Sequence, residues 1–208
     1  MGERLYAPVN TARDAYKENI MDFDNIISRE ADGVEIEYGV LVGGEDTVFI
    51  KAGWGGTYCG EDDKYLRFAA FLREKYGVSV ICASNPEESR SSVDADVSVI
   101  SELARGRVYL WGTSNGAFKC IDIAEKVSFC KTVLVNMPLM VNFYRTKERL
   151  KKLPAESIAF AFGENDASMK FTPFLFSLGC ELVTLSGAEH TLDMTDGECA
   201  VFGKLLFE

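Results

Sequence analysis

Residues 107–127 read RVYLWGTSNGAFKCIDIAEKV, and this stretch decides the fold. Its mostly apolar first part predicts a strand at 107–111. Four small or apolar residues then recur at the spacing of one helix face: Ala117, Cys120, Ile121 and Ala124. That spacing predicts a helix over 115–127. The segment Gly112-Thr113-Ser114-Asn115-Gly116 lies between them, so the stretch is interpreted as a strand, a tight turn and a helix.

The turn has the pattern G-x-S-x-G in the strand–turn–helix context that a nucleophile elbow requires. Ser114 must stand on a very tight turn, in a strained backbone conformation that projects its hydroxyl away from the sheet. Side chains at positions 112 and 116 would collide with neighbouring backbone, and glycine avoids the collision. Ser114 also lies at a helix N-terminus, whose dipole favours developing negative charge. The pattern by itself also fits an ordinary serine-capped turn, so the prediction depends on the strand and helix around it.

Outward from this stretch, strands and helices alternate along the chain from residue 34 onward. Apolar residues alternate with polar ones in a half-exposed strand: Val34, Ile36, Tyr38 and Val40. Short apolar runs predict five further strands: 47–50, 78–83, 132–136, 157–162 and 180–185. Helical spacing predicts three further helices: 62–76, 92–105 and 196–207. We expect Gly77 to end the helix at 62–76. We expect Asp196 to cap the last helix, which should end near Phe207.

Strands that alternate with helices imply right-handed crossovers and a mostly parallel, doubly wound sheet with helices on both faces. The 208 residues suffice for one α/β domain with a sizeable core, so we expect a single domain over 1–208. The polar segment 1–30 is ambiguous and allows one more helix within 10–28, capped by Asn10. In such sheets the active site lies beyond the carboxyl ends of the strands. Reactive residues that directly follow strands are therefore the candidates.

Composition excludes several classes of function. The net charge of −10 repels phosphate backbones and anionic lipids, so we expect neither nucleic acid nor a membrane as partner. The chain shows no signal peptide and no run of about 18 apolar residues, which favours a cytoplasmic protein. Its six cysteines form no C-x-x-C pair and it has one histidine, so we expect free thiols and no metal site. Cys82 and Cys120 lie in apolar stretches and are expected in the core.

His190, the only histidine of the chain, ends the segment Gly187-Ala188-Glu189-His190. This segment follows the strand expected at 180–185, which places the imidazole at the same sheet edge as Ser114. An imidazole titrates near neutral pH, so it can accept the serine proton and later return it to a leaving group. We therefore interpret His190 as the base.

A carboxylate that could orient the imidazole ends the segment Gly163-Glu164-Asn165-Asp166, after the strand expected at 157–162. Asp166 would accept a hydrogen bond from the second imidazole nitrogen and stabilise the imidazolium as it forms. Glu164 is the rival in the same loop. Asp193 is a weaker rival because it lies too close to His190 along the chain to be aimed from a separate strand.

A glycine-rich loop at 53–56 follows the strand expected at 47–50. Acyl transfer needs backbone N–H groups directed at the oxyanion. We expect one from Asn115, next to Ser114, and the other from Trp54 in this loop. The competing interpretation is a phosphate cradle, but no G-x-x-x-x-G-K-[ST] string is present and Lys51 precedes the glycines instead of following them.

Over about residues 34–208 the sequence resembles the α/β-hydrolase superfamily. Four segments carry the resemblance: Ala-Gly-Trp-Gly-Gly at 52–56, Gly-Thr-Ser-Asn-Gly at 112–116, Gly-Glu-Asn-Asp at 163–166 and Gly-Ala-Glu-His at 187–190. The resemblance implies that Ser114, Asp166 and His190 form a catalytic triad and that Trp54 and Asn115 supply the amides of the oxyanion hole. Family members often carry His-Gly at the start of that loop, where this chain has Ala-Gly.

The family often inserts a helical lid before the aspartate strand. This chain has only about 137–156 available there, which leaves room for one helix and no large cap domain. Its basic residues are interpreted as a solvated helix face: Arg145, Lys147, Arg149, Lys151 and Lys152. The site should be open, which suits small or surface-presented substrates.

The expected reaction is hydrolysis of an ester-type bond in a small-molecule acyl substrate through an acyl-enzyme on Ser114. It needs no metal or organic cofactor. A carboxylesterase or thioesterase fits these residues. A peptidase, an acyltransferase or a lactone hydrolase on the same triad stays open, as does a non-catalytic binding protein of the same fold, because pocket shape decides among them. The oligomeric state stays open as well.

Overall fold

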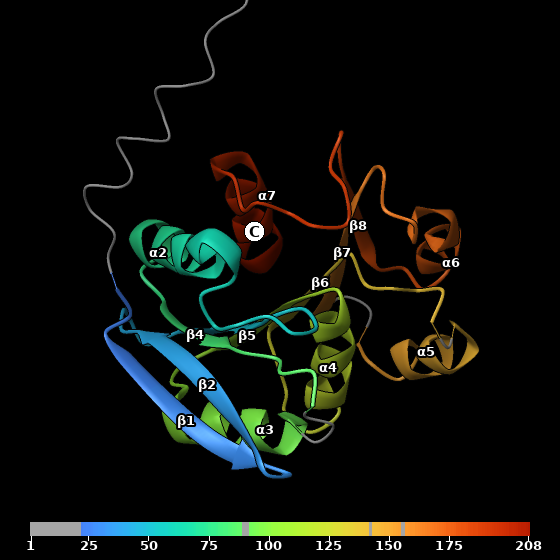
Figure 1. Ribbon diagram of the computed structural model, residues 1–208. Coiled ribbons are helices and arrows are strands. Elements are labelled where there is room, and N and C mark those ends of the chain that lie inside the picture. The colour runs from blue at the N-terminus through green and yellow to red at the C-terminus, as the bar shows by residue number, and fades with distance from the viewer. Residues whose placement is uncertain (1–21, 89–91, 142, 155–156) are drawn as a thin grey trace, which may run out of the picture.

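A computed structural model describes residues 22–88, 92–141, 143–154 and 157–208 (Figure 1). Its strands are β1 (Asn25–Ala31), β2 (Val34–Leu41), β3 (Thr47–Lys51), β4 (Ser79–Ala83), β5 (Val108–Thr113), β6 (Lys131–Val135), β7 (Ile158–Gly163) and β8 (Glu181–Leu185). They form one sheet in the order β1-β2-β4-β3-β5-β6-β7-β8. The strands from β3 to β8 are parallel, whereas β1 and β2 pair antiparallel. The predicted, mostly parallel sheet is confirmed.

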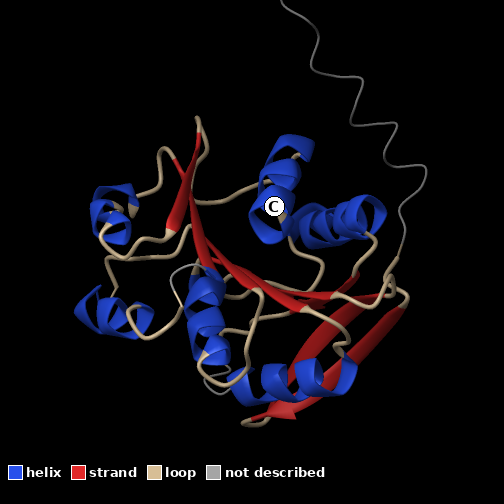
Figure 2. Cartoon of the chain, turned by 180° about the vertical axis from the view of Figure 1, so that it is seen from behind, coloured by secondary structure: helices blue, strands red, loops and turns tan. Residues whose placement is uncertain are grey.

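The α-helices are α2 (Lys64–Tyr76), α3 (Ser92–Leu103), α4 (Asn115–Ala124), α5 (Phe143–Leu150), α6 (Pro173–Phe176) and α7 (Asp196–Phe207). Two 3-10 turns accompany them, η2 (Glu61–Asp63) and η4 (Met169–Phe171). In Figures 1 and 2, α2 and α7 lie on one face of the sheet, and α3 and α4 lie on the other. Within the described ranges, no helix has both the length and the apolar character that crossing a membrane requires.

Two apolar clusters, one on each face, hold these layers together. On the face covered by α2 and α7, the Trp111 ring lies 5.3 Å from that of Phe68 and 5.5 Å from that of Phe202, between ring centroids. The cluster on the other face joins α3, α4, α5 and α6 to the sheet. Cys82 and Cys120 are buried in the core, as predicted, and all six cysteines are free thiols. The central strands of the sheet, such as β3 and β7, are thus buried on both faces.

The helix expected within 10–28 is wrong in the part that the structure describes, because Asn25–Ala31 is β1. Residues 1–21, including Asn10, lie outside the described residues. β1 pairs along its length with β2, with Ile27 opposite Tyr38. The connecting turn is Asp32-Gly33, with φ of 54° and 76°. Asp-Gly favours such a two-residue hairpin turn, and this local signal outweighed the weak helical pattern.

Helix ends differ from the expected ones by a few residues. Asp62 and Asp63 have positive φ, so α2 begins only at Lys64. Gly77 ends that helix with φ 67°, as predicted. Helix α7 is capped by Thr195 and not by Asp196, because the Thr195 hydroxyl accepts from the N–H of Glu198 and the Glu198 carboxylate accepts from the N–H of Thr195. This reciprocal pair is a capping box.

Candidate active site

Ser114 occupies the turn between β5 and α4, with φ 52° and ψ −124°. Few residues other than glycine adopt positive φ, so this is a strained position. A Cβ atom at Gly112 would lie 2.4 Å from the Cys120 Sγ, and one at Gly116 would lie 2.2 Å from the Ala52 carbonyl oxygen. Both contacts are too short for real Cβ atoms. The predicted clash with backbone is confirmed at Gly116, whereas at Gly112 the shortest contact is with the Cys120 side chain.

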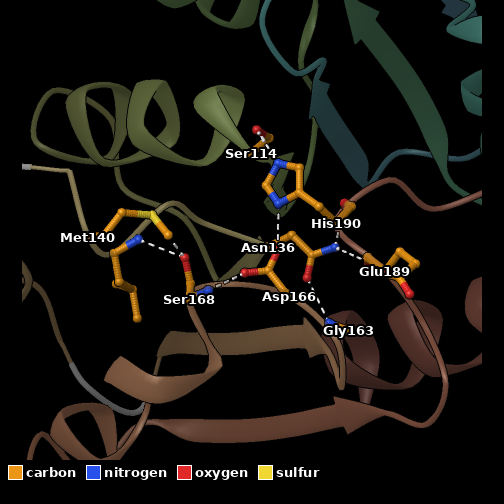
Figure 3. Close-up of polar contacts among 9 residues, drawn as sticks. Ser114, Asn136, Met140, Gly163, Asp166, Ser168, Glu189 and His190 are labelled. Atoms are coloured by element: carbon orange, nitrogen blue, oxygen red, sulfur yellow. Dashed lines mark hydrogen bonds and ion pairs between the residues drawn. The ribbon is translucent and has the colours of Figure 1, made fainter.

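The structure brings Ser114, His190 and Asp166 together at the carboxyl edge of the sheet (Figure 3). The Ser114 Oγ lies 2.9 Å from the His190 Nε2. On the other side of the ring, the His190 Nδ1 lies 2.5 Å from the Asp166 Oδ2. A neutral imidazole protonated on Nδ1 satisfies both contacts, because it donates to the carboxylate and accepts from the hydroxyl. The three side chains thus form one continuous hydrogen-bond chain.

Asp166 is the buried end of this chain. Its side chain is 1% exposed, against 48% for that of His190. The second carboxylate oxygen, Oδ1, accepts from the backbone N–H of Ser168 at 2.6 Å. Both oxygens therefore have a donor, which holds the carboxylate in one orientation.

The two rival carboxylates lie in other surroundings. The Glu164 Oε2 accepts from the N–H of Gly187 at 2.8 Å and from the Ser186 hydroxyl at 3.1 Å. These hydrogen bonds hold the pKa of Glu164 below its usual range. Asp193 accepts a hydrogen bond from the Arg67 guanidinium through its backbone carbonyl. Among the described carboxylates, only Asp166 contacts the imidazole.

Asn136, which the sequence analysis did not single out, holds the His190 loop through hydrogen bonds to its backbone. It follows β6, is fully buried and has φ 45°. Its Nδ2 donates to the His190 carbonyl at 2.7 Å and to the Glu189 carbonyl at 3.2 Å, while its Oδ1 accepts from the N–H of Gly163 at 2.8 Å. Figure 3 shows this side chain between the end of β7 and the His190 loop. Its place after a strand and its tolerance of positive φ were the only signals in the sequence.

The glycine-rich loop runs beside the serine. A Cβ atom on Gly53 would lie 3.5 Å from the Cβ of Ser114. Within the described part of the chain, neither the N–H of Trp54 nor that of Asn115 donates to a protein acceptor. Both N–H groups that were expected as oxyanion donors are therefore free to receive an oxygen of a ligand.

A cavity of about 630 Å³ opens next to Ser114 and His190. Its apolar wall is made of buried residues: Tyr65, Trp111, Leu192 and Met194. Burial raises the pKa of Tyr65 to about 12, so the phenol stays neutral at physiological pH. Glu61 and Lys64 lie among the lining residues as the charged groups. A pocket with this wall suits an uncharged, apolar group.

No protein-family model and no curated protein matches the chain. Solved structures do match it. The thioesterase domain from the curacin biosynthetic pathway is 17% identical with a TM-score of 0.63, over 88% of this chain and 99% of that one. A cold-adapted esterase from an Arctic intertidal metagenomic library is 16% identical with a TM-score of 0.63, over 87% and 93%. An alpha-beta serine hydrolase homologue from Coxiella burnetii is 13% identical with a TM-score of 0.62, over 90% and 97%. At these identities the likeness establishes the fold.

Proposed function

The chain has the α/β-hydrolase fold, and on this premise we propose that it is a serine hydrolase that cleaves an ester or thioester bond. The observation that carries the proposal is the hydrogen-bond chain from the Ser114 hydroxyl through His190 to the buried Asp166. Three side chains from three post-strand loops meet with the contacts that acyl transfer to a serine needs. The esterase and thioesterase among the similar structures support the same reaction class.

In the proposed mechanism, the His190 Nε2 accepts the proton of the Ser114 hydroxyl as the oxygen attacks the substrate carbonyl carbon. Asp166 stabilises the imidazolium that forms. The N–H groups of Trp54 and Asn115 donate to the oxyanion of the tetrahedral intermediate. This intermediate collapses, the bond to the leaving group breaks, and His190 returns its proton to the alcohol or thiol that departs.

The second half of the reaction regenerates the serine. His190 removes a proton from water, and the hydroxide attacks the acyl-enzyme carbonyl. The carboxylic acid is released when the Ser114 oxygen regains a proton from His190. The tight turn that gives Ser114 its φ of 52° presents the Oγ atom at the cavity, where substrate and water can reach it.

The cavity favours a small, uncharged acyl group. Its wall of Tyr65, Trp111, Leu192 and Met194 offers apolar contact beside Ser114. The His190 side chain is 48% exposed, so a leaving group that it protonates can depart into solvent. We infer that substrates with short apolar acyl chains and varied leaving groups are accepted.

The decisive experiment compares purified wild type with Ser114→Ala. We expect wild type to hydrolyse p-nitrophenyl acetate and to react covalently with a fluorophosphonate probe, and S114A to do neither while keeping its thermal unfolding temperature. Ser101→Ala is the matched control, because Ser101 is an exposed serine on α3 that bonds only its own helix. An S114A variant with the wild-type rate would overturn the assignment. A wild type inert to both reagents would favour a non-catalytic binding protein.

A second experiment separates reactions on the same serine. Wild type is assayed with a panel of p-nitrophenyl esters of increasing acyl length, with acyl thioesters and with short peptides. We expect esters or thioesters of short chains to turn over and peptides not to. Preferential cleavage of peptides would replace the esterase proposal with a peptidase.

A further inference from the structure

Asn85 connects the two segments that carry the proposed oxyanion donors. It lies just after β4 and is 1% exposed. Its Nδ2 donates to the carbonyl of Ala52 at 3.1 Å and to the side-chain Oδ1 of Asn115 at 3.0 Å. Ala52 opens the glycine-rich loop, and Asn115 directly follows Ser114. One amide group thus donates to both segments that carry the proposed oxyanion donors, the glycine-rich loop and the turn after β5.

The backbone of Asn85 holds the same loop at two further points. Its N–H donates to the carbonyl of Gly56 at 2.8 Å, and its carbonyl accepts from the N–H of Gly55 at 2.9 Å. Trp54 lies between Ala52, which the Asn85 side chain holds, and Gly55, which the Asn85 backbone holds. Pro86 follows Asn85 and restricts its backbone, so the anchor is itself stiff.

The loop needs such an anchor because of its composition. Three of the four residues at 53–56 are glycines, and Gly55 has φ 69°. Glycine backbones are the least restricted of all, so the loop has little stiffness of its own. An oxyanion hole works only when its donors are held where the oxygen will develop charge, and a displacement of about 1 Å is costly.

We propose that Asn85 is a positioning residue that fixes the N–H groups of Trp54 and Asn115 relative to each other. The inference rests on the proposed function, since it concerns how that site stabilises its transition state. Asn85 touches neither the imidazole nor the Asp166 carboxylate through any hydrogen bond that the described residues make. Its loss should therefore weaken transition-state binding and leave the proton transfer through His190 unchanged.

The first test is Asn85→Asp, which keeps the size of the side chain and removes both N–H donors. A carboxylate oxygen would then face two acceptors, the Ala52 carbonyl and the Asn115 Oδ1. We expect kcat for p-nitrophenyl acetate to fall by about 10- to 100-fold, with little change in KM. The affinity for a trifluoromethyl ketone, whose adduct with serine carries an oxyanion, should fall in parallel. Asn85→Ala removes the same two donors without adding a charge, and the shape of its pH–rate profile should stay that of wild type.

The matched control is Asn25→Asp, the same change at an exposed position on the edge strand β1. It should keep the wild-type kcat and ketone affinity. Wild-type kcat and ketone affinity in a folded N85D would overturn the inference. A loss that appears in KM alone, or a shifted pH profile in N85A, would also overturn it, because either result would place the effect outside the oxyanion hole.

A second variant decides the matter if N85D does not fold. Asn115→Ala removes the acceptor of Asn85 and keeps the backbone N–H of residue 115, so it should lower kcat and ketone affinity in the same direction. Combined with Asn85→Ala, it should cost less than the sum of the two single changes, since both remove one contact. An N115A variant with wild-type kcat and ketone affinity would overturn the inference. A wild type with no activity and no probe labelling would instead overturn the proposed function, and this inference with it.

Discussion

Among single residues, the position of one carboxylate distinguishes the proposed mechanism from its alternatives. Asp166, Glu164 and Asp193 are the three candidates for the carboxylate that orients His190, and they differ in what they contact. Asp166 is buried and contacts the Nδ1 atom, whereas Glu164 is exposed and bonds the turn at 186–187. Burial matters because an imidazolium next to a buried carboxylate gains more stabilisation than one in water.

Asp166→Asn tests this assignment. The asparagine amide can donate to Nδ1, which favours the imidazole tautomer that cannot accept the serine proton. We expect kcat for p-nitrophenyl acetate to fall by about 10⁴-fold with the fold intact. Glu164→Gln and Asp193→Asn are the matched controls and should retain most of the activity. A greater loss in E164Q than in D166N would transfer the orienting role to Glu164.

How far single residues could be predicted depends on how local their signal is. Ser114 belongs to a five-residue motif, and His190 is the only histidine, so both could be found from the sequence. Asn85 and Asn136 could not, because an asparagine after a strand has no distinctive pattern. The partners of both are largely backbone atoms of segments distant in the chain, and only the fold brings them together.

Among elements, the strands were easier to predict than the helix ends. Strands β3 to β7 follow from short apolar runs because both faces of a parallel sheet are buried. β1 was missed because it is an edge strand whose residues are only half-buried at best, as in Ile27 and Arg29. Its signal lay in the Asp32-Gly33 turn. The short α6 and η4, which follow Asp166, have no periodic pattern of sufficient length.

The capping box of α7 supports a helix whose first turn adjoins the cavity residue Met194. Thr195→Ala removes the hydroxyl that accepts from the N–H of Glu198. We expect the free energy of unfolding to fall by about 1 kcal/mol, measured by urea denaturation. The melting temperature should fall by about 2–4 °C. Thr195→Ser keeps the hydroxyl and should be close to wild type; equal losses in both variants would refute the cap.

Glu164 joins the loop after β7 to the turn after β8, and this link should depend on pH. Hydrogen bonds from the Gly187 N–H and the Ser186 hydroxyl lower the pKa of its carboxyl. A lowered pKa means that the ionised form stabilises the fold at neutral pH and that this contribution is lost as the pH falls through the lowered pKa. Glu164→Gln should therefore be less stable than wild type at pH 7, and the difference should shrink as the pH falls through the lowered pKa of Glu164. Urea unfolding across that range measures it, and a difference that grows towards low pH would contradict the assignment.

At the scale of the whole molecule, a buried charge pair joins the end of β3 to helix α3, close to the proposed site. The Lys51 Nζ lies 2.8 Å from the Asp96 Oδ2 and donates to the Ser84 carbonyl at 2.8 Å. The Tyr38 hydroxyl donates to the Asp96 Oδ1 at 3.0 Å. Both charged side chains are fully buried. The network thus ties β2, β3, α3 and the segment after β4 together directly beneath the glycine-rich loop.

Removing one charge of this pair should cost far more than removing both. Burial already raises the pKa of Asp96, and Lys51→Met would leave that carboxylate without its cation. We expect K51M to lose about 3–5 kcal/mol of unfolding free energy at pH 7. The double variant Lys51→Met/Asp96→Asn, which keeps an acceptor for the Tyr38 hydroxyl, should recover a large part of this loss.

The stability of K51M should also depend on pH. An unpaired buried carboxyl binds a proton more tightly in the folded state than in the unfolded state. K51M should therefore gain stability relative to the double variant as the pH falls from 7 to about 5. Urea denaturation of wild type, K51M and the double variant at both pH values measures these free energies of unfolding. A double variant as unstable as K51M at pH 7 would show that the unpaired charge of Asp96 is not the cause of the loss.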